Sequence, residues 1–183
     1  MAGTEPGFRT MIALAVTAMT LVVVASNILV QYPVNDWLTW GAFTYPVAFL
    51  VTDLANRRLG PAAARRVVYI GFALAVVCSA VLATPRIAIA SGTAFLAAQL
   101  LDVLVFDRLR RGNWWRAPLV SSVLGSTLDT ALFFTLAFAA TGLPWIGWAI
   151  GDLAVKLTVA LAMLLPFRLM MGGRDAGVGR QPA

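Results

Sequence analysis

Six apolar segments, each about as long as a lipid bilayer is thick, dominate this sequence; they cover residues 10–30, 37–55, 67–83, 87–106, 118–141 and 145–169. A helix needs about 17 to 25 predominantly apolar residues to span a bilayer. The segments are apolar on all sides, whereas the strands of an outer-membrane barrel alternate apolar and polar residues. The sequence therefore predicts an all-α polytopic membrane protein, a bundle of six transmembrane helices.

Basic residues between the segments fall almost entirely on one side of the predicted membrane. That side holds the arginine clusters at 57–66 and 108–116 together with Arg9, Arg168, Arg174 and Arg180, and only Arg86 falls on the other. Positive charge marks the cytoplasmic side of bacterial membrane proteins. We therefore predict that both termini are cytoplasmic and that the chain lies in the inner (plasma) membrane.

Composition narrows the functional classes. A chain with 60% hydrophobic and 12% charged residues is not an ordinary soluble domain. The net charge of +6 comes from arginines in the links between spans, so the predicted partner is the lipid bilayer and not nucleic acid. With no His, a single Cys and no glycine-rich phosphate loop, the chain is expected to hold no metal and no cofactor and not to be an enzyme.

Ionisable side chains inside the spans are the candidates for a functional site, because a charge at the bilayer centre costs about 2.5 to 3.5 kcal/mol or more. The sequence offers Asp53, Asp102, Asp129, Asp152 and Lys156. Asp129 and Lys156 both lie near the middle of their spans. Gln99 precedes Asp102 by three residues and shares its helix face. Asp53, at the end of its span, is interpreted as an interfacial residue that snorkels or pairs with Arg57.

Two interpretations of Asp129 and Lys156 stay open. Lys156 could pair with Asp129, or with Asp152 one turn before it, and lock the helices together with no ligand involved. Alternatively, the surplus of acids over lysine inside the spans suits a ligand that brings hydrogen-bond donors or positive charge.

Two backbone features bear on packing. Pro46 lies inside the second segment, removes one helical hydrogen bond and predicts a kink. Gly147 and Gly151 form a small-xxx-small pair that suits helix contact within the bundle or between copies of the chain, so a homo-oligomer stays open.

Motifs in five of the six segments match one known family; they are residues 26–31 (SNILVQ), 40–46 (WGAFTYP), 49–54 (FLVTDL), 64–66 (ARR), 99–103 (QLLDV), 105–110 (VFDRLR), 114–118 (WWRAP), 129–130 (DT) and Lys156. Over nearly its whole length the chain resembles the queuosine precursor transporters, also described as vitamin uptake transporters. The resemblance implies uptake of 7-cyano-7-deazaguanine, its 7-aminomethyl relative, or both, for salvage into the tRNA base queuosine. It implies a transporter domain at 10–170, with a short cytoplasmic tail at 1–9 and a disordered cytoplasmic tail at 171–183.

Such a substrate would account for the polar residues inside the predicted spans. A guanine-like edge offers two adjacent N–H donors, which one carboxylate, Asp129 or Asp102, can accept together. The substrate carbonyl then needs a donor, and aromatic rings can stack on the bicycle. The predicted substrate-binding residues are Asp129, Asp102, Gln99, Asn27, Lys156, Phe43, Tyr45 and Phe133.

Two rival functions remain. The first is a substrate-capture subunit of an energy-coupling factor importer, which needs a separate ATPase. Such subunits commonly have an Ala-xxx-Ala docking motif in the first helix. Ala13-xxx-Thr17 does not fit this motif, so no ATPase partner is expected. The second is a carrier for another planar heterocycle, such as a vitamin. That alternative keeps the architecture and changes the contacts at the substrate edge.

Overall fold

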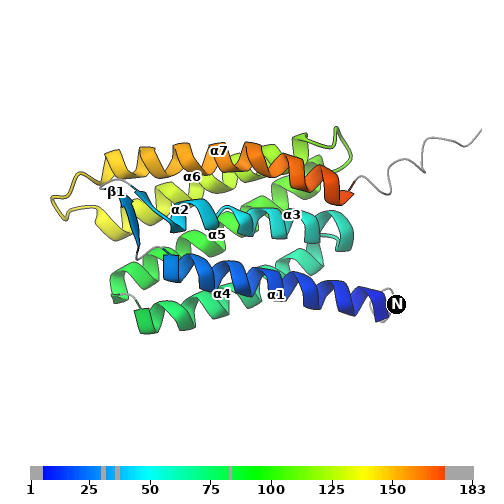
Figure 1. Cartoon of the computed structure of the whole chain (residues 1–183), viewed down its shortest axis with the longest axis horizontal. Helices are drawn as coiled ribbons and strands as arrows, with labels where there is room; N and C mark the ends of the chain where they lie inside the picture. Colours follow the sequence, from blue (N-terminus) through cyan, green and yellow to red (C-terminus); the bar gives the residue numbers. More distant parts are fainter. Residues whose placement is uncertain (1–5, 30–31, 36–37, 83, 172–183) are drawn as a thin grey trace, which may run out of the picture.

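The chain forms an elongated bundle of helices in a computed structural model (Figure 1). The structure describes residues 6–29, 32–35, 38–82 and 84–171, with the exception of a few side chains within these ranges. The helices are α1 (Pro6–Leu29), α2 (Gly41–Thr44), α3 (Val47–Leu59), α4 (Pro61–Leu82), α5 (Pro85–Leu109), α6 (Arg116–Phe138) and α7 (Trp145–Met171). A small antiparallel hairpin of β1 (Pro33–Asn35) and β2 (Leu38–Thr39) links α1 to α2. In the bundle α1 packs on α4, α6 packs on α7, and α3 and α5 lie between these two pairs.

Long apolar helices confirm the predicted class, an all-α polytopic membrane protein. Among the described residues, four helices are long and apolar enough to cross a membrane: Gly7–Ser26 within α1, and the whole of α5, α6 and α7. Most helix bounds lie within four residues of the predicted segments, whereas α4 begins six residues before the segment 67–83, at Pro61. Helix α1 begins at Pro6, so part of the predicted tail at 1–9 is helical, and the predicted tail at 171–183 lies outside the described residues after Met171.

The second predicted span is broken at the proline. The turn at Tyr45 and Pro46 separates α2 from α3. Pro46 has no N–H to donate, and the N–H groups of Ala48 and Phe49 bond to carbonyls three residues back, those of Tyr45 and Pro46, at 3.0 and 3.1 Å. The predicted kink is confirmed as a break between two helices, and the side chain of Tyr45 lies at that break.

The middle of the bundle is held by an apolar core and by one close contact at a glycine. Met19, Val67 and Phe95 are at most 2% exposed and belong to an apolar core that joins α1, α3, α4 and α5. Gly125 of α6 lies directly against the ring of Phe49, because a Cβ added there would be 2.6 Å from Phe49 Cε1. This close approach holds α3, α5 and α6 together at mid-depth.

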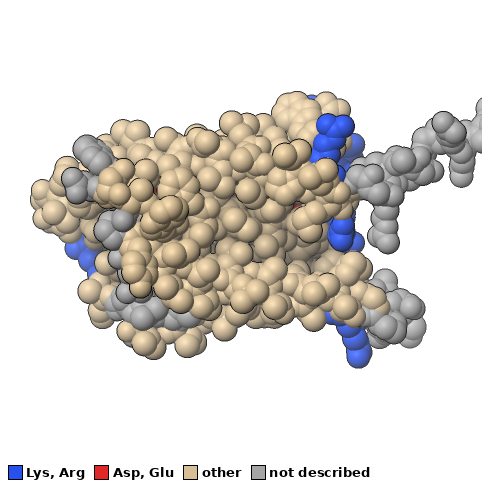
Figure 2. All heavy atoms as spheres, in the orientation of Figure 1, with Lys and Arg blue, Asp and Glu red and all other residues tan. Residues whose placement is uncertain are grey.

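Basic side chains gather at one end of the bundle, and the side of the bundle that Figure 2 shows is almost free of charged residues. That end holds the arginines at the start of α1, α4 and α6 and in the last turns of α3, α5 and α7. At the opposite end, Arg86 donates to the carbonyls of Leu136 and Ala139 at 3.0 and 2.7 Å. A cation suits this position because carbonyls at a helix C-terminus lack helical partners and carry partial negative charge.

Candidate functional site

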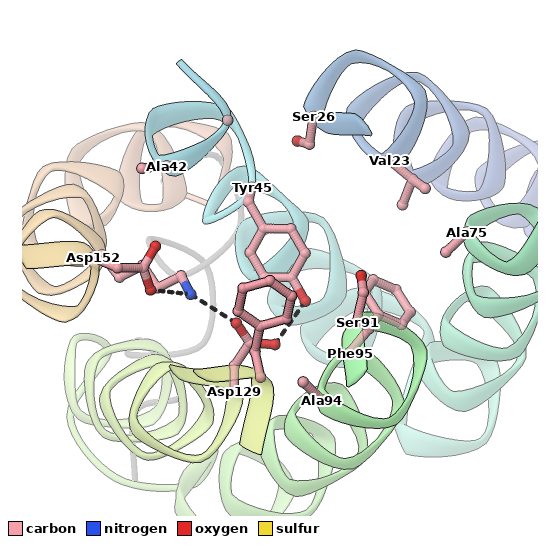
Figure 3. Close-up of a pocket in the computed structure, with 13 residues that line it drawn as sticks. Val23, Ser26, Ala42, Tyr45, Ala75, Ser91, Ala94, Phe95, Asp129 and Asp152 are labelled. Atoms are coloured by element: carbon pink, nitrogen blue, oxygen red, sulfur yellow. Dashed lines mark hydrogen bonds and ion pairs between the residues drawn. The ribbon is translucent and has the colours of Figure 1, made fainter. Parts of the chain in front are cut away.

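A cavity of about 130 Å³ lies between the helices in the half of the bundle nearest the β hairpin. Residues of α1, α2, α4, α5, α6 and α7, together with Tyr45 at the helix break, line it; they are Val23, Ser26, Gly41, Ala42, Tyr45, Ala75, Ser91, Ala94, Phe95, Asp129, Phe133, Asp152 and Lys156. Small residues on most walls leave room for a ligand. Figure 3 shows Tyr45, Asp129 and Asp152 pointing toward one another across this space.

One lysine joins two carboxylates at the cavity wall. Lys156 Nζ of α7 lies 2.7 Å from Asp129 Oδ2 of α6 and 2.5 Å from Asp152 Oδ2, one turn earlier in α7. Its third proton faces Thr130 Oγ1 at 3.2 Å. An ammonium has three N–H donors, so each of them has an acceptor here. Both pairings that the sequence left open therefore occur together.

Neighbouring side chains fix this cluster in position. Tyr45 OH donates to Asp129 Oδ1 at 2.9 Å, and Thr130 Oγ1 donates to Asp152 Oδ2 at 2.8 Å. The Lys156 amine also lies 5.3 Å from the centre of the Tyr45 ring, within cation–π range. Because Tyr45 lies between α2 and α3, the cluster joins this segment of the chain to α6 and α7.

The cluster keeps spare capacity for hydrogen-bond donors. Two carboxylates against one ammonium give it a formal charge of −1 in their ionised forms. Each carboxylate has about four lone-pair sites, and the contacts above fill fewer than that. The rings of Tyr45, Phe95 and Phe133 and the hydroxyls of Ser26 and Ser91 complete the lining. A flat aromatic molecule that carries N–H donors matches such a wall.

Four of the predicted substrate-binding residues meet in this cavity: Asp129, Lys156, Tyr45 and Phe133. Phe43 is 40% exposed, packs on Trp40 with ring centres 6.0 Å apart and does not line the cavity. Asn27 belongs to α1, but its side chain lies outside the described part of the structure.

The other two predicted residues, Asp102 and Gln99, lie apart from the cavity in a second polar cluster. Both are fully buried on α5, and Gln99 Oε1 accepts from Thr52 Oγ1 of α3 at 2.6 Å. Asp53, also of α3, lies close enough to Asp102 for their charges to interact. The sequence grouped Asp102 with Asp129, and the structure separates them.

Two details differ from the sequence interpretation. Asp53 is 2% exposed and accepts hydrogen bonds from Ser121 and Ser122 of α6, so its interpretation as an interfacial, snorkelling residue is wrong. Asp152 was considered only as a partner for Lys156, yet it lines the cavity. Its spacing, four residues before Lys156 on one helix face, was the signal that could have placed it there.

Known proteins resemble this chain closely in sequence. The family described as "Putative vitamin uptake transporter" matches residues 39–84 and 78–171. The "Queuosine precursor transporter" of Escherichia coli K12 is 35% identical over 175 aligned residues, which cover 80% of this chain and 79% of that protein. The "Probable queuosine precursor transporter" of Haemophilus influenzae is 34% identical, with 79% of each chain covered. No solved structure matches the chain significantly.

Proposed function

The chain belongs to the queuosine precursor transporter family, and from this membership we propose that it imports 7-deazaguanine precursors of queuosine for salvage into tRNA. Membership makes it a multi-pass membrane transporter and bears out the expectation that it is not an enzyme. We propose as substrates 7-cyano-7-deazaguanine and its 7-aminomethyl relative, and we assign the residues that bind them below. The cavity walled by Asp129, Lys156, Asp152 and aromatic rings is the observation that carries it.

The proposed topology has six spans and cytoplasmic termini in a bacterial inner membrane. Helix α4, at 22 residues, and the broken pair of α2 and α3 supply the two spans beyond the four long apolar helices. The arginine-rich end of the bundle faces the cytoplasm by the positive-inside rule. The cavity then lies in the outer half of the membrane, below the β hairpin. We leave a homo-oligomer open: a Cβ on Gly151 would meet no other atom within 4 Å, so this face of α7 is free of close helix contact within the described chain.

The size of the cavity suits this substrate class. One water needs roughly 10 to 15 Å³ of such space, so a cavity of about 130 Å³ has room for about ten waters. A 7-deazaguanine with a small 7-substituent has about a dozen non-hydrogen atoms, and ligand sites commonly enclose most of a ligand's surface. The fit supports a bicyclic heterocycle.

We assign the polar contacts by chemistry. The adjacent N–H donors of the guanine-like edge meet the free lone pairs of Asp129 and Asp152. Lys156 or a lining serine hydroxyl donates to the substrate carbonyl. The bicycle lies against Tyr45 and Phe133, both of which line the cavity. Asp102 and Gln99 take no part in substrate contact in this proposal, because they lie outside the cavity.

Uptake into liposomes that contain only this protein tests the function. Labelled 7-cyano-7-deazaguanine should enter wild-type vesicles, and Asp129→Asn should abolish its entry at equal protein abundance. Asp107→Asn is the matched control, because Asp107 pairs with Arg110 near the arginine-rich end, away from the cavity. Entry unchanged in Asp129→Asn would contradict the assigned site.

The same assay separates the rival functions. Binding without uptake by well-folded protein would favour a capture subunit that needs an ATPase. Uptake of a vitamin heterocycle in preference to the 7-deazaguanines would favour the other carrier. Neither rival has a specific structural observation in its favour.

A further inference from the structure

A second buried polar cluster lies between the substrate cavity and the arginine-rich end of the bundle. Its centre is the acid pair of Asp53 on α3 and Asp102 on α5, which are 2% and 0% exposed. Ser121 Oγ of α6 donates to Asp53 Oδ1 at 3.1 Å, and Ser122 Oγ lies 3.5 Å from Asp53 Oδ2. Three spans therefore converge on two neighbouring carboxyl groups.

Among the described residues, no lysine or arginine forms an ion pair with either acid. Asp53 and Asp102 lie close enough for their carboxyl groups to interact. Lys156 of α7 is held by Asp129 and Asp152, and Arg57 donates to the carbonyl of Arg110. The arginines on the other helices that pack here are exposed: Arg9, Arg65, Arg66, Arg108, Arg116 and Arg168. The acid pair thus has no cation of its own within the described structure.

Unpartnered polar atoms mark this cluster as incomplete. Both carboxyl oxygens of Asp102, the amide nitrogen of Gln99 and the hydroxyl of Ser126 are buried without a hydrogen-bond partner. Ser126 lines a small cavity of about 10 Å³ together with Asp53 and Ser122. Leaving a charged buried group unpaired costs several kcal/mol. Buried polar groups in native structures usually have a hydrogen-bond partner, so the unpartnered carboxyl oxygens of Asp102 point to a donor or cation that binds there.

We propose that Asp53 and Asp102 bind the cation that drives uptake, a proton shared between the two carboxyl groups or a Na⁺ ion held by their oxygens. Either one supplies the positive charge that the pair lacks, since two adjacent carboxylates in an apolar interior cannot both stay ionised unpaired. A shared proton would also give Asp102 its missing hydrogen-bond partner. This role as coupling site rests on the proposed uptake function, although cation binding itself does not.

The geometry connects this cation site to the substrate cavity. Helix α6 carries Ser121 and Ser122 at the acid pair and Asp129 at the cavity, about two turns farther along. Between the two sites, the ring of Phe49 packs against Gly125. The same ring lies nearly perpendicular to the ring of Tyr45, with the ring centres 6.3 Å apart. A change of charge at Asp53 alters how α6 packs on α3, and the substrate cavity borders the same contact.

Two transport modes distinguish coupling from substrate binding. In proteoliposomes, uphill accumulation of labelled 7-cyano-7-deazaguanine needs the cation gradient, whereas counterflow exchange against internal unlabelled substrate does not. We expect Asp102→Asn to lose accumulation and keep counterflow, and Asp129→Asn to lose both. Asp107→Asn should keep both. Imposing a proton gradient and a Na⁺ gradient separately identifies the ion.

Infrared spectroscopy of purified protein in lipid tests cation binding without any transport. A shared proton predicts the carbonyl stretch of a protonated carboxylic acid in wild-type protein, with or without Na⁺. The band should disappear in Asp102→Asn and in Asp53→Asn and persist in Asp107→Asn. A Na⁺ ion predicts that saturating Na⁺ removes this band from wild-type protein.

The outcomes separate the two proposals. If wild-type protein shows counterflow, and neither a proton gradient nor a Na⁺ gradient changes accumulation, the proposed coupling site is wrong. The proposed transport function would still be supported. An infrared spectrum with no carboxylic acid band assignable to Asp53 or Asp102, with or without Na⁺, would overturn the cation site itself. Absence of counterflow in wild-type protein that still shows the band would contradict the proposed function and keep the cation site. The transport outcomes need only wild-type protein, and either Asp102→Asn or Asp53→Asn is enough to assign the infrared band, so one variant that fails to fold does not block the test.

Discussion

Lys156 of α7 lies 2.7 Å from Asp129 of α6, and the same amine lies 2.5 Å from Asp152. The lysine is 4% exposed, so the three charges interact with little screening by water. One cation therefore holds two anions at the wall of the cavity, and its loss has different consequences from the loss of either acid.

Lys156→Met should destabilise the protein strongly. It leaves the buried carboxylate of Asp129 and the partly buried carboxylate of Asp152 without their cation, and breaking a buried ion pair by removing one partner costs about 3 to 5 kcal/mol. Asp152→Asn should cost much less, because Asp129 and Lys156 remain a balanced pair. Thermal unfolding in lipid or detergent measures both. Equal losses in the two variants would contradict the bridging role of the lysine.

Neutralising the whole cluster separates stability from binding. Lys156→Met combined with Asp129→Asn and Asp152→Asn leaves no unpaired charge, so much of the lost stability should return. Substrate uptake should stay absent, because the acceptors for the substrate N–H groups have gone. Recovery of uptake along with stability would mean that the cluster only locks the helices.

Tyr45→Phe removes one hydrogen bond and keeps the ring. Tyr45 OH donates to Asp129 at 2.9 Å, and hydrogen bonds to charged groups contribute about 1.5 to 3 kcal/mol. We expect a loss of stability in that range and a raised KM for uptake. Tyr45→Ala should weaken uptake further, since it also removes the ring that lines the cavity. A Tyr45→Phe protein with wild-type stability and KM would argue against the hydrogen bond.

Gly125→Ala should disturb the contact between α6 and α3. The added methyl group would lie 2.6 Å from the Phe49 ring, and overpacking typically costs about 1 to 3 kcal/mol. Gly151→Ala is the matched control: its methyl group meets nothing within 4 Å, so the better helix propensity of Ala should leave stability unchanged or raise it by about 0.5 to 1 kcal/mol. Thermal unfolding compares them, and Phe49→Leu should relieve the Gly125→Ala defect.

The topology can be tested by labelling single cysteines in intact cells. With Cys78 replaced by Ser, Leu143→Cys should react with a membrane-impermeant maleimide from outside. Asn113→Cys should react only after the membrane is opened. Both positions are exposed in links at opposite ends of the bundle. The reverse pattern would invert the proposed orientation, and equal labelling of both would contradict the span count.

The sequence predicted the helices well because apolar length and proline are local signals. The predicted segment 145–169 matches α7, and Pro46 marked the break in the second span. Lys156 and Asp129 were recognised by their depth alone, since both lie near the middle of long apolar runs. Their approach to one another needed only that α6 and α7 be neighbours across a short link.

The relative depth of residues on neighbouring helices was harder to predict than the helices themselves. Asp102 lies eleven residues before Asn113 in the link, and Asp129 lies sixteen residues after it. On antiparallel helices that difference amounts to about 7 Å at about 1.5 Å per residue, enough to separate two sites. Rotation about the helix axis also decides which side chains meet, and no local pattern reports it. The orientation of Phe43 toward Trp40 is such a case.

The lysine shared by two acids also constrains the order in which substitutions can accumulate over evolution. A lineage that first loses Asp152 keeps a balanced pair, whereas one that first loses Lys156 leaves two neighbouring carboxylates without a cation. Change at these positions should therefore begin at an acid, and the lysine should be replaced only after the acids have gone. Among diverging relatives, the three positions are expected to vary as a linked set.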